Sequence, residues 1–86
     1  PVDFKFSDGP EKLVVEVKLS SNQSVVHGYQ KQLTAYQDAE NTAKGYYLLL
    51  DVGRMGNKWD NLMKVAKKDK DFGEHRKIFK IDDKNV

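Results

Sequence analysis

The sequence predicts a small α/β domain: a mixed β-sheet with flanking helices, in the order β-β-α-β-α-β. Residues 2–6 and 12–19 alternate between apolar and polar side chains, and a Gly-Pro turn signal separates them. Two helix-like stretches then alternate with two short apolar runs. A hairpin followed by crossover connections gives a mixed sheet with helices packed on it. At 86 residues, the chain is expected to form one domain over residues 1–86.

The two alternating runs constrain the register of the hairpin, because a strand pair must keep its apolar residues on one side. Those residues are Val2, Phe4 and Phe6 in the first run and Leu13, Val15 and Val17 in the second. Asp3 then shares the opposite face with Glu16 and Lys18, and a tight turn at Gly9-Pro10 sets Asp3 directly opposite Glu16. Two carboxylates in that arrangement repel each other. A bound cation would remove the repulsion.

The remaining elements follow from periodicity. They are a helix over 24–41, a strand over 46–52, a helix over 58–71 and a strand over 76–81. The run 46–52 is continuously apolar, which is typical of a strand covered on both faces. In the last strand, we expect Phe79 and Ile81 to point inward.

The amino-acid composition limits the kinds of metal site and of binding partner that we expect. Cysteine is absent and only two histidines occur, so a metal would be bound mainly by carboxylates, which favours hard ions such as Mg²⁺ or Mn²⁺. The net charge of +2 permits a nucleic-acid partner without requiring one. No apolar run approaches the roughly 20 residues of a membrane span. We therefore expect no membrane partner and an intracellular, cytoplasmic location.

The triplet Glu16-Val17-Lys18 indicates a functional site only because of the residues around it. An acidic residue two before a lysine also occurs at Asp3 and at Asp82, about as often as composition predicts. However, Glu16 and Lys18 interrupt an otherwise apolar strand, where charges are costly unless paired or metal-bound. The competing interpretation is an ordinary solvent-exposed sheet face.

The following helix carries Gln32 and Tyr36 four residues apart, and therefore on one face. Solvent exposure for Gln32 and a place in the apolar stripe for Tyr36 are the plain alternatives. Together, Pro1-Val2-Asp3, Glu16-Val17-Lys18 and Gln32-Leu33-Thr34-Ala35-Tyr36 resemble the PD-(D/E)XK nuclease superfamily, and are similar to its RecB-type nuclease domains in particular. The resemblance covers roughly residues 1–52.

The resemblance implies a restriction-endonuclease-like α-β-β-β-α-β core that lacks its first helix and strand here. We therefore expect a fragment of a longer chain, and either a homo-oligomer or a missing N-terminal segment that completes the fold.

The function implied is that of a Mg²⁺- or Mn²⁺-dependent deoxyribonuclease, which hydrolyses phosphodiester bonds in DNA. Asp3, Glu16 and the backbone carbonyl of Val17 would hold the metal, and Lys18 would orient the attacking water. Gln32 and Tyr36 would steady the site or touch the DNA backbone. Candidate DNA contacts are Lys5, on the face of Asp3, and Lys31.

Two other functions remain open from the sequence. One is a DNA- or protein-binding module that keeps the nuclease fold without cleaving. The other is a structural or oligomerisation fragment. Endonuclease and exonuclease activities are both compatible with the motifs.

Overall fold

The computed structural model describes the backbone of residues 2–8 and 11–82, and side chains from Lys12 onward. Its elements follow the predicted order. They are β1 (Val2–Asp8), β2 (Glu11–Leu19), α1 (Val25–His27), η1 (Gly28–Gln32), α2 (Leu33–Glu40), β3 (Gly45–Asp51), α3 (Lys58–Lys67) and β4 (Arg76–Asp82). The segments α1, η1 and α2 run on without a break as one helix, in which η1 is a π-helical turn. The expected helix over 24–41 is confirmed within a residue at each end.

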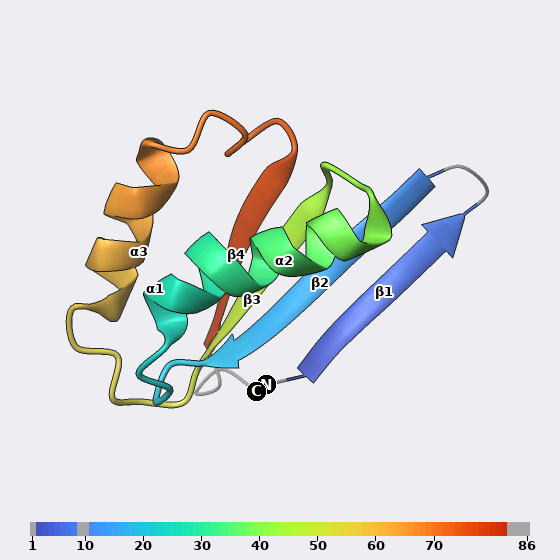
Figure 1. Cartoon of the computed structure of the whole chain (residues 1–86). Coiled ribbons are helices and arrows are strands. Elements are labelled where there is room, and N and C mark those ends of the chain that lie inside the picture. Colours follow the sequence, from blue (N-terminus) through green and yellow to red (C-terminus); the bar gives the residue numbers. More distant parts are fainter. Residues whose placement is uncertain (1, 9–10, 83–86) are drawn as a thin grey trace.

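The four strands form one sheet in the order β1-β2-β3-β4 (Figure 1). β1 and β2 are antiparallel, whereas β3 pairs in parallel with both β2 and β4. The chain therefore has the predicted α/β class with a mixed sheet. The register sets Asp3 opposite Glu16, which confirms the parity argument made from the alternating runs. The turn residues Gly9 and Pro10 lie outside the described part of the chain.

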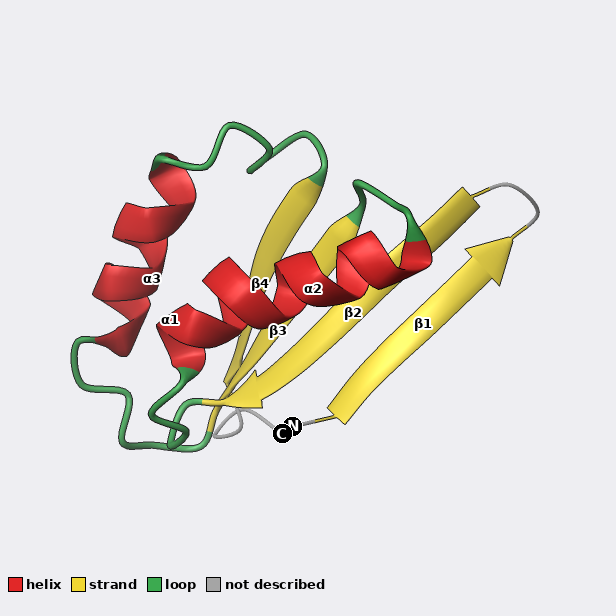
Figure 2. Cartoon of the chain, in the orientation of Figure 1, coloured by secondary structure: helices red, strands yellow, loops and turns green. Residues whose placement is uncertain are grey.

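All the described helices lie on one face of the sheet (Figure 2). The two crossovers step across the sheet in the same direction, from β2 to β3 and from β3 to β4, so crossovers of the same hand place their helices on the same side. We call this side the helix-covered face. It carries Val14, Glu16 and Lys18 from β2, Tyr47 and Leu49 from β3, and Ile78 from β4.

The core sits between the helices and this face. Its buried members are Val14, Val25, Tyr29, Leu33, Tyr47, Leu49, Leu62 and Ala66. These residues join β2 and β3 to both helical segments, which fixes the long helix directly over β2. No helix of the described residues combines the length and the apolar character that crossing a bilayer requires.

We call the opposite face of the sheet the open face. Two expectations about the residues on this face were wrong. Phe79 and Ile81 do not point inward, since they are 43% and 44% exposed. The run from Tyr46 to Val52 is not covered on both faces. Burial alternates along β3, with Tyr47 and Leu49 fully buried and the residues between them only partly so. Both expectations were based on the apolar character of these strands. In sequence, a strand with one open apolar face looks the same as a strand with two covered faces.

Candidate active site on the helix-covered face of the sheet

Glu16 and Lys18 lie side by side on β2, beneath the long helix. Their side chains point to the same face because strand residues two apart do so. Glu16 is fully buried and Lys18 is 2% exposed, and both oxygens of the Glu16 carboxylate are out of contact with solvent. An ordinary exposed sheet face would leave these side chains in water. The structure therefore removes that interpretation and places two charged groups within a small core, where desolvation is costly.

Gly28 allows the helix to approach these two residues closely. It lies in η1 with ordinary helical dihedral angles, φ −58° and ψ −41°. A Cβ atom at this position would stand 2.6 Å from the hydroxyl oxygen of Tyr47 and 2.8 Å from Cε of Lys18. The glycine is thus required by the space available rather than by its backbone conformation. A π-helical turn at the same point is a feature frequently found at functional sites.

Tyr47 forms the wall of the site on β3. It is paired with Glu16 in the sheet register, and its hydroxyl donates a hydrogen bond of 2.5 Å to the carbonyl oxygen of Val25. Burial raises the pKa of Tyr47, and the negative charge of Glu16 raises it further. The phenol therefore stays protonated and holds α1 against the sheet. The ring of Tyr29 packs edge-on against it, with 5.8 Å between the ring centroids.

The first strand brings two predicted site residues into register with β2. Asp3 pairs with Glu16, and Lys5 pairs with Val14. Directly opposed residues of an antiparallel pair share a face, so both positions belong to the helix-covered face. The side chains of Asp3 and Lys5 lie outside the described part of the structure. Val17, whose carbonyl the resemblance assigns to a metal, lies in the middle of β2 between Glu16 and Lys18.

The three predicted residues of the long helix differ in their surroundings. Gln32 is partly buried at the end of η1, and its amide oxygen is shielded from solvent without a hydrogen-bond partner among the described residues. Tyr36 packs against the core, as its position in the apolar stripe predicted. Lys31 is exposed and lines a cavity of about 440 Å³ beside Tyr29.

The donor atoms suit a hard cation, although the described side chains do not complete a site. Over residues 12–82, no three His, Cys, Asp or Glu side chains gather closely enough to hold a metal. The side chain of Asp3 lies outside this range. Two opposed carboxylate residues and a backbone carbonyl supply only oxygen ligands, which is the set that Mg²⁺ and Mn²⁺ prefer. The buried position of Glu16, opposite Asp3 in the sheet register, fits the same role.

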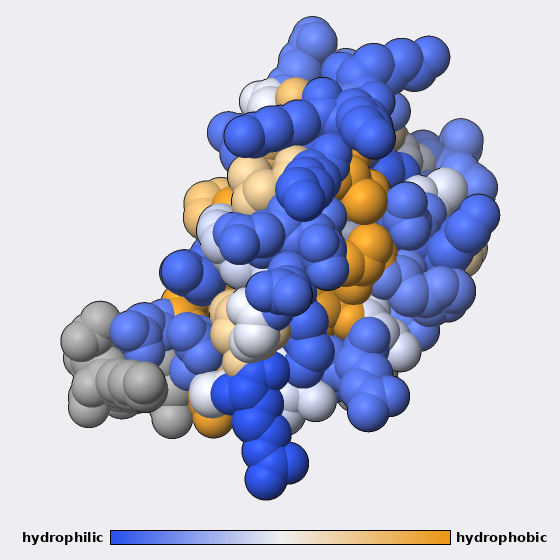
Figure 3. Space-filling model, turned by 90° about the vertical axis from the view of Figure 1, so that its left-hand side faces the viewer, coloured by the Kyte–Doolittle hydropathy of each residue, from blue (hydrophilic) through white to orange (hydrophobic). Residues whose placement is uncertain are grey.

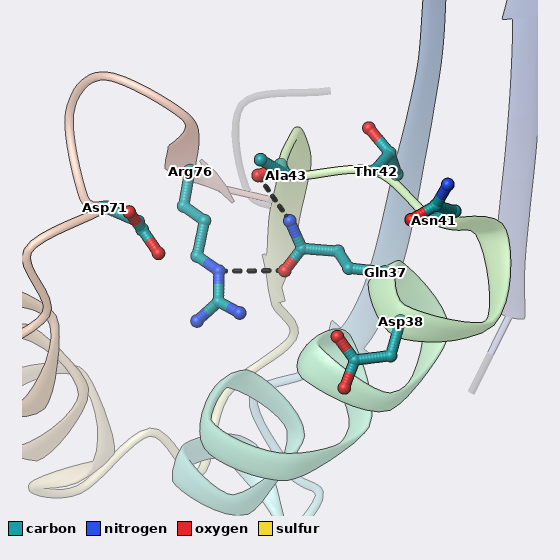
Figure 4. A pocket seen from close by; sticks show the side chains of 7 residues that line it. All are labelled: Gln37, Asp38, Asn41, Thr42, Ala43, Asp71 and Arg76. Atoms are coloured by element: carbon teal, nitrogen blue, oxygen red, sulfur yellow. Dashed lines mark hydrogen bonds between the residues drawn. The ribbon is translucent and has the colours of Figure 1, made fainter.

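Sequence reasoning missed Arg76, the polar residue that ties the end of the sheet to the helices. Its Nε donates to Oε1 of Gln37 (2.8 Å), whose Nε2 in turn donates to the carbonyl of Ala43 (2.5 Å; Figure 4). Its Nη2 donates to Thr34 (2.8 Å), and its Nη1 lies 3.1 Å from Oδ2 of Asp69. This network borders a cavity of about 390 Å³, lined by Gln37, Asp38, Asn41, Thr42, Ala43, Asp71 and Arg76. Partners 39 and 42 residues apart leave no signal in a local pattern.

Asp69 completes the Arg76 network and is also bound by Tyr29, whose hydroxyl donates a hydrogen bond of 2.6 Å to it. Burial raises the pKa of Asp69. The hydrogen bonds from Tyr29 and from the backbone N–H of Asp71, together with the positive charge of Arg76, outweigh that effect and lower the pKa below its usual value. This carboxylate is therefore a structural anion, distinct from Glu16.

Comparison with known families gives one result. A family model described as "Domain of unknown function (DUF8371)" matches residues 1–54. The chain belongs to this family. The DUF8371 match runs from β1 to just beyond β3, so it includes Asp3, Glu16, Lys18, Gln32 and Tyr36. No curated protein and no solved structure matches the sequence significantly.

Proposed function

We propose that this chain is the core of a metal-dependent DNA nuclease of the PD-(D/E)XK type, with a restriction-endonuclease-like fold. The observation that carries the proposal is the burial of Glu16 and Lys18 on the helix-covered face, with Asp3 opposed to Glu16 in the sheet register. A nuclease metal site gives each of these three residues a chemical role.

In this proposal, the carboxylates of Asp3 and Glu16 and the carbonyl of Val17 hold Mg²⁺ or Mn²⁺. When bound, the metal lowers the pKa of a coordinated water and polarises the scissile phosphate. Asp3 and Glu16 come from adjacent antiparallel strands, so the hairpin sets their separation rigidly. Neither residue depends on a mobile loop for its position.

Lys18 orients the attacking water and offsets the negative charge that develops on the phosphate. Its side chain passes under Gly28, whose missing Cβ leaves the room that Lys18 Cε occupies. The hydroxyl of Tyr47 closes the same space from β3. Confinement of this kind holds an ammonium group in one place, and an electrostatic catalyst needs that preorganisation.

The long helix supplies the supporting residues. The shielded amide oxygen of Gln32 lacks a partner among the described residues and is available to a water or ligand at the site. Tyr36 supports the helix from the core. Lys5, two residues along β1 from Asp3, and the exposed Lys31 are the candidates for contact with DNA phosphates.

The open face supports a further part of the proposal, that another protein layer completes the fold. Leu19, Val52, Phe79 and Ile81 are each more than 40% exposed. All-parallel sheets are almost always covered on both faces, and three of the four strands here, β2, β3 and β4, run parallel. We propose that a second copy of this chain or an additional N-terminal segment of the same protein covers this face.

A non-cleaving DNA- or protein-binding module is the alternative, and one observation favours it. Glu16 is fully buried, whereas a cleaving site must admit a phosphate group to its metal. In such a module, Glu16 and Lys18 would serve the architecture of the core and no DNA would be cut.

A nuclease assay separates the two functions. The wild-type chain is incubated with single-stranded, duplex and branched DNA in Mg²⁺, in Mn²⁺ and in a chelator. We expect cleavage only with metal, and its loss in Glu16→Gln and Lys18→Met, with Glu74→Gln and Lys12→Ala as exposed controls that keep it. Circular dichroism confirms that each variant folds. Cleavage that persists in both site variants would refute the nuclease, and metal-independent DNA binding without cleavage would support the module.

A further inference from the structure

A second surface of the molecule combines an aromatic ring with lysines. Trp59, Asp60, Met63, Lys64 and Lys67 line a cavity of about 420 Å³ on α3. Met63 and Lys67 lie four and eight residues after Trp59, which puts them on the same side of the helix as the indole. Lys64 lies four residues after Asp60 and borders the same cavity from the neighbouring side of the helix. Lys64 and Lys67 are exposed, while Trp59 and Met63 are partly buried. The cavity therefore has an apolar floor and a basic rim.

Lys80 of β4 completes this surface. Its ammonium nitrogen lies 4.9 Å from the centroid of the Trp59 ring, which is the geometry of a cation–π contact. Lys80 itself is exposed. Trp59 packs partly against the core, so the ring is held in place and its position does not depend on the lysine. We call Trp59, Lys64, Lys67 and Lys80 the α3–β4 platform.

The sheet register relates the platform to the candidate active site. Lys18 pairs with Leu49, and Leu49 pairs with Lys80, so Lys18 and Lys80 lie in one row across three strands. Neighbouring strands are about 4.8 Å apart, which separates the two backbones by about 10 Å. Lys58, next to Trp59, donates a hydrogen bond of 2.6 Å to the carbonyl of Ser20, two residues beyond Lys18. The platform is therefore fixed to the same end of β2 as the site.

The face that carries α3 is largely hydrophilic, with a narrower apolar band across it (Figure 3). Single-stranded nucleic acid is bound by this combination, in which lysines follow the phosphates and an aromatic ring stacks on a base. Asp60 is the single acidic residue among those that line the cavity. A protein-docking surface would need a broader apolar area than one partly buried indole and one methionine.

We infer that the α3–β4 platform binds a single-stranded segment of the nucleic acid, with a base stacked on Trp59 and phosphates contacting Lys64 and Lys67. The ligand class rests on the proposed nuclease function. Lys80 moves from the ring to a phosphate when the base arrives. The platform thereby holds the strand on the β4 side of the site and would favour frayed or single-stranded DNA over intact duplex.

The test measures binding without cleavage. Trp59 is the one tryptophan of the chain, so its intrinsic fluorescence reports directly on the platform. The wild-type protein and Glu16→Gln are titrated with a short oligothymidylate in a chelator, and we expect quenching of Trp59 in both. A duplex of the same length should quench it much less. Absence of quenching, or equal quenching by the duplex, would overturn the inference.

The second part of the test compares the affinities of variants for a labelled oligonucleotide, measured by fluorescence anisotropy. Base–aromatic stacking contributes about 5- to 150-fold to affinity, so Trp59→Leu should weaken binding within that range and Trp59→Phe by less. Lys64→Ala/Lys67→Ala should also reduce the slope of log affinity against log salt by about 1.4, or 0.7 per lost contact. Lys12→Ala/Lys44→Ala is the control for net charge. Equal losses in both double variants would overturn the inference.

The two arms separate this inference from the proposed function. Oligonucleotide binding by the platform without any metal-dependent cleavage would refute the nuclease and leave the platform intact. Cleavage with unchanged single-strand affinity in the platform variants would refute the platform and leave the nuclease intact.

Discussion

Replacing Gly28 by alanine tests the close contact between the long helix and the candidate site. On an isolated helix, alanine would stabilise this position by about 1 kcal/mol relative to glycine. Here, the added methyl group would overlap the hydroxyl of Tyr47 at 2.6 Å and Cε of Lys18 at 2.8 Å. Neither atom has room to retreat, since Tyr47 is fully buried and Lys18 nearly so.

The expected result is a net loss of stability. Overpacking a core typically costs about 1–3 kcal/mol, and displacing the Tyr47 hydroxyl from the carbonyl of Val25 costs about 1 kcal/mol more. Subtracting the helical gain leaves Gly28→Ala destabilised by about 1–3 kcal/mol. For a domain of this size, that lowers the melting temperature on the order of 10 °C.

A double-mutant cycle with Tyr47→Phe identifies the cause, using chemical denaturation followed by circular dichroism. Tyr47→Phe removes the hydroxyl that the methyl group would strike. The double variant should therefore lose less stability than the two single variants together, with a coupling of at least about 1 kcal/mol. Gln30→Ala, at an exposed position on the same helix, should change stability by less than about 0.5 kcal/mol. A stabilised Gly28→Ala with an additive cycle would refute the reasoning.

Three further predictions concern the remainder of the fold. Ser20→Ala leaves the backbone N–H of Val52 without its 2.9 Å acceptor, so it should lower the free energy of unfolding by about 1–3 kcal/mol in chemical denaturation. Ser21→Ala, at an exposed position, is the control and should leave the stability nearly unchanged. Equal effects of the two substitutions would contradict this. The folded pKa of Asp69 is lowered, so its contribution is present above the unfolded pKa of about 3.9 and lost as pH falls through the folded value. The stability difference between wild type and Asp69→Asn should therefore shrink below about pH 4, and a constant difference would argue against the ion pair. The folded pKa of Tyr47 is raised, so its contribution should be full below about pH 10 and fall above it, and Tyr47→Phe should lessen that fall. Unchanged alkaline unfolding in the variant would contradict this.

Side-chain period made the hairpin predictable. A slip of one residue would have moved every apolar residue of the strand to the other face, so the alternation placed Asp3 on the face of Glu16, and the short turn then set the two residues opposite each other. The order of helices and strands could also be predicted from the sequence, because each element has its own pattern of apolar and polar residues. These features depend on residues close together in the chain.

The sequence did not predict which face of the sheet the helices cover. Phe79 and Ile81 are as apolar as core residues, yet they lie on the open face, while the charged Glu16 and Lys18 lie under the helix. Hydrophobicity alone therefore assigns the wrong face of β4. The side on which the helices pack depends on the hand of the crossovers, which an alternating pattern does not encode.

The site itself was predicted in part. The residues with distinctive chemistry, Glu16 and Lys18, stood out because they interrupt an apolar strand. From the sequence alone, Gly28 is only a residue of low helix propensity, and its role appears when Tyr47 and Lys18 are seen beneath it. Contacts of this kind join β2, β3 and the helix in space, so no short stretch of sequence reports them.

The most direct test of the account is calorimetric titration with Mn²⁺ of the wild-type chain, Asp3→Asn and Glu16→Gln. Each variant is checked for folding by circular dichroism, and Glu74→Gln serves as the exposed control. The account predicts Mn²⁺ binding by the wild type and the control, with that binding lost in both site variants. Mn²⁺ binding that survives in both site variants, or no binding by the folded wild type, would contradict the assignment of Asp3 and Glu16 as metal ligands.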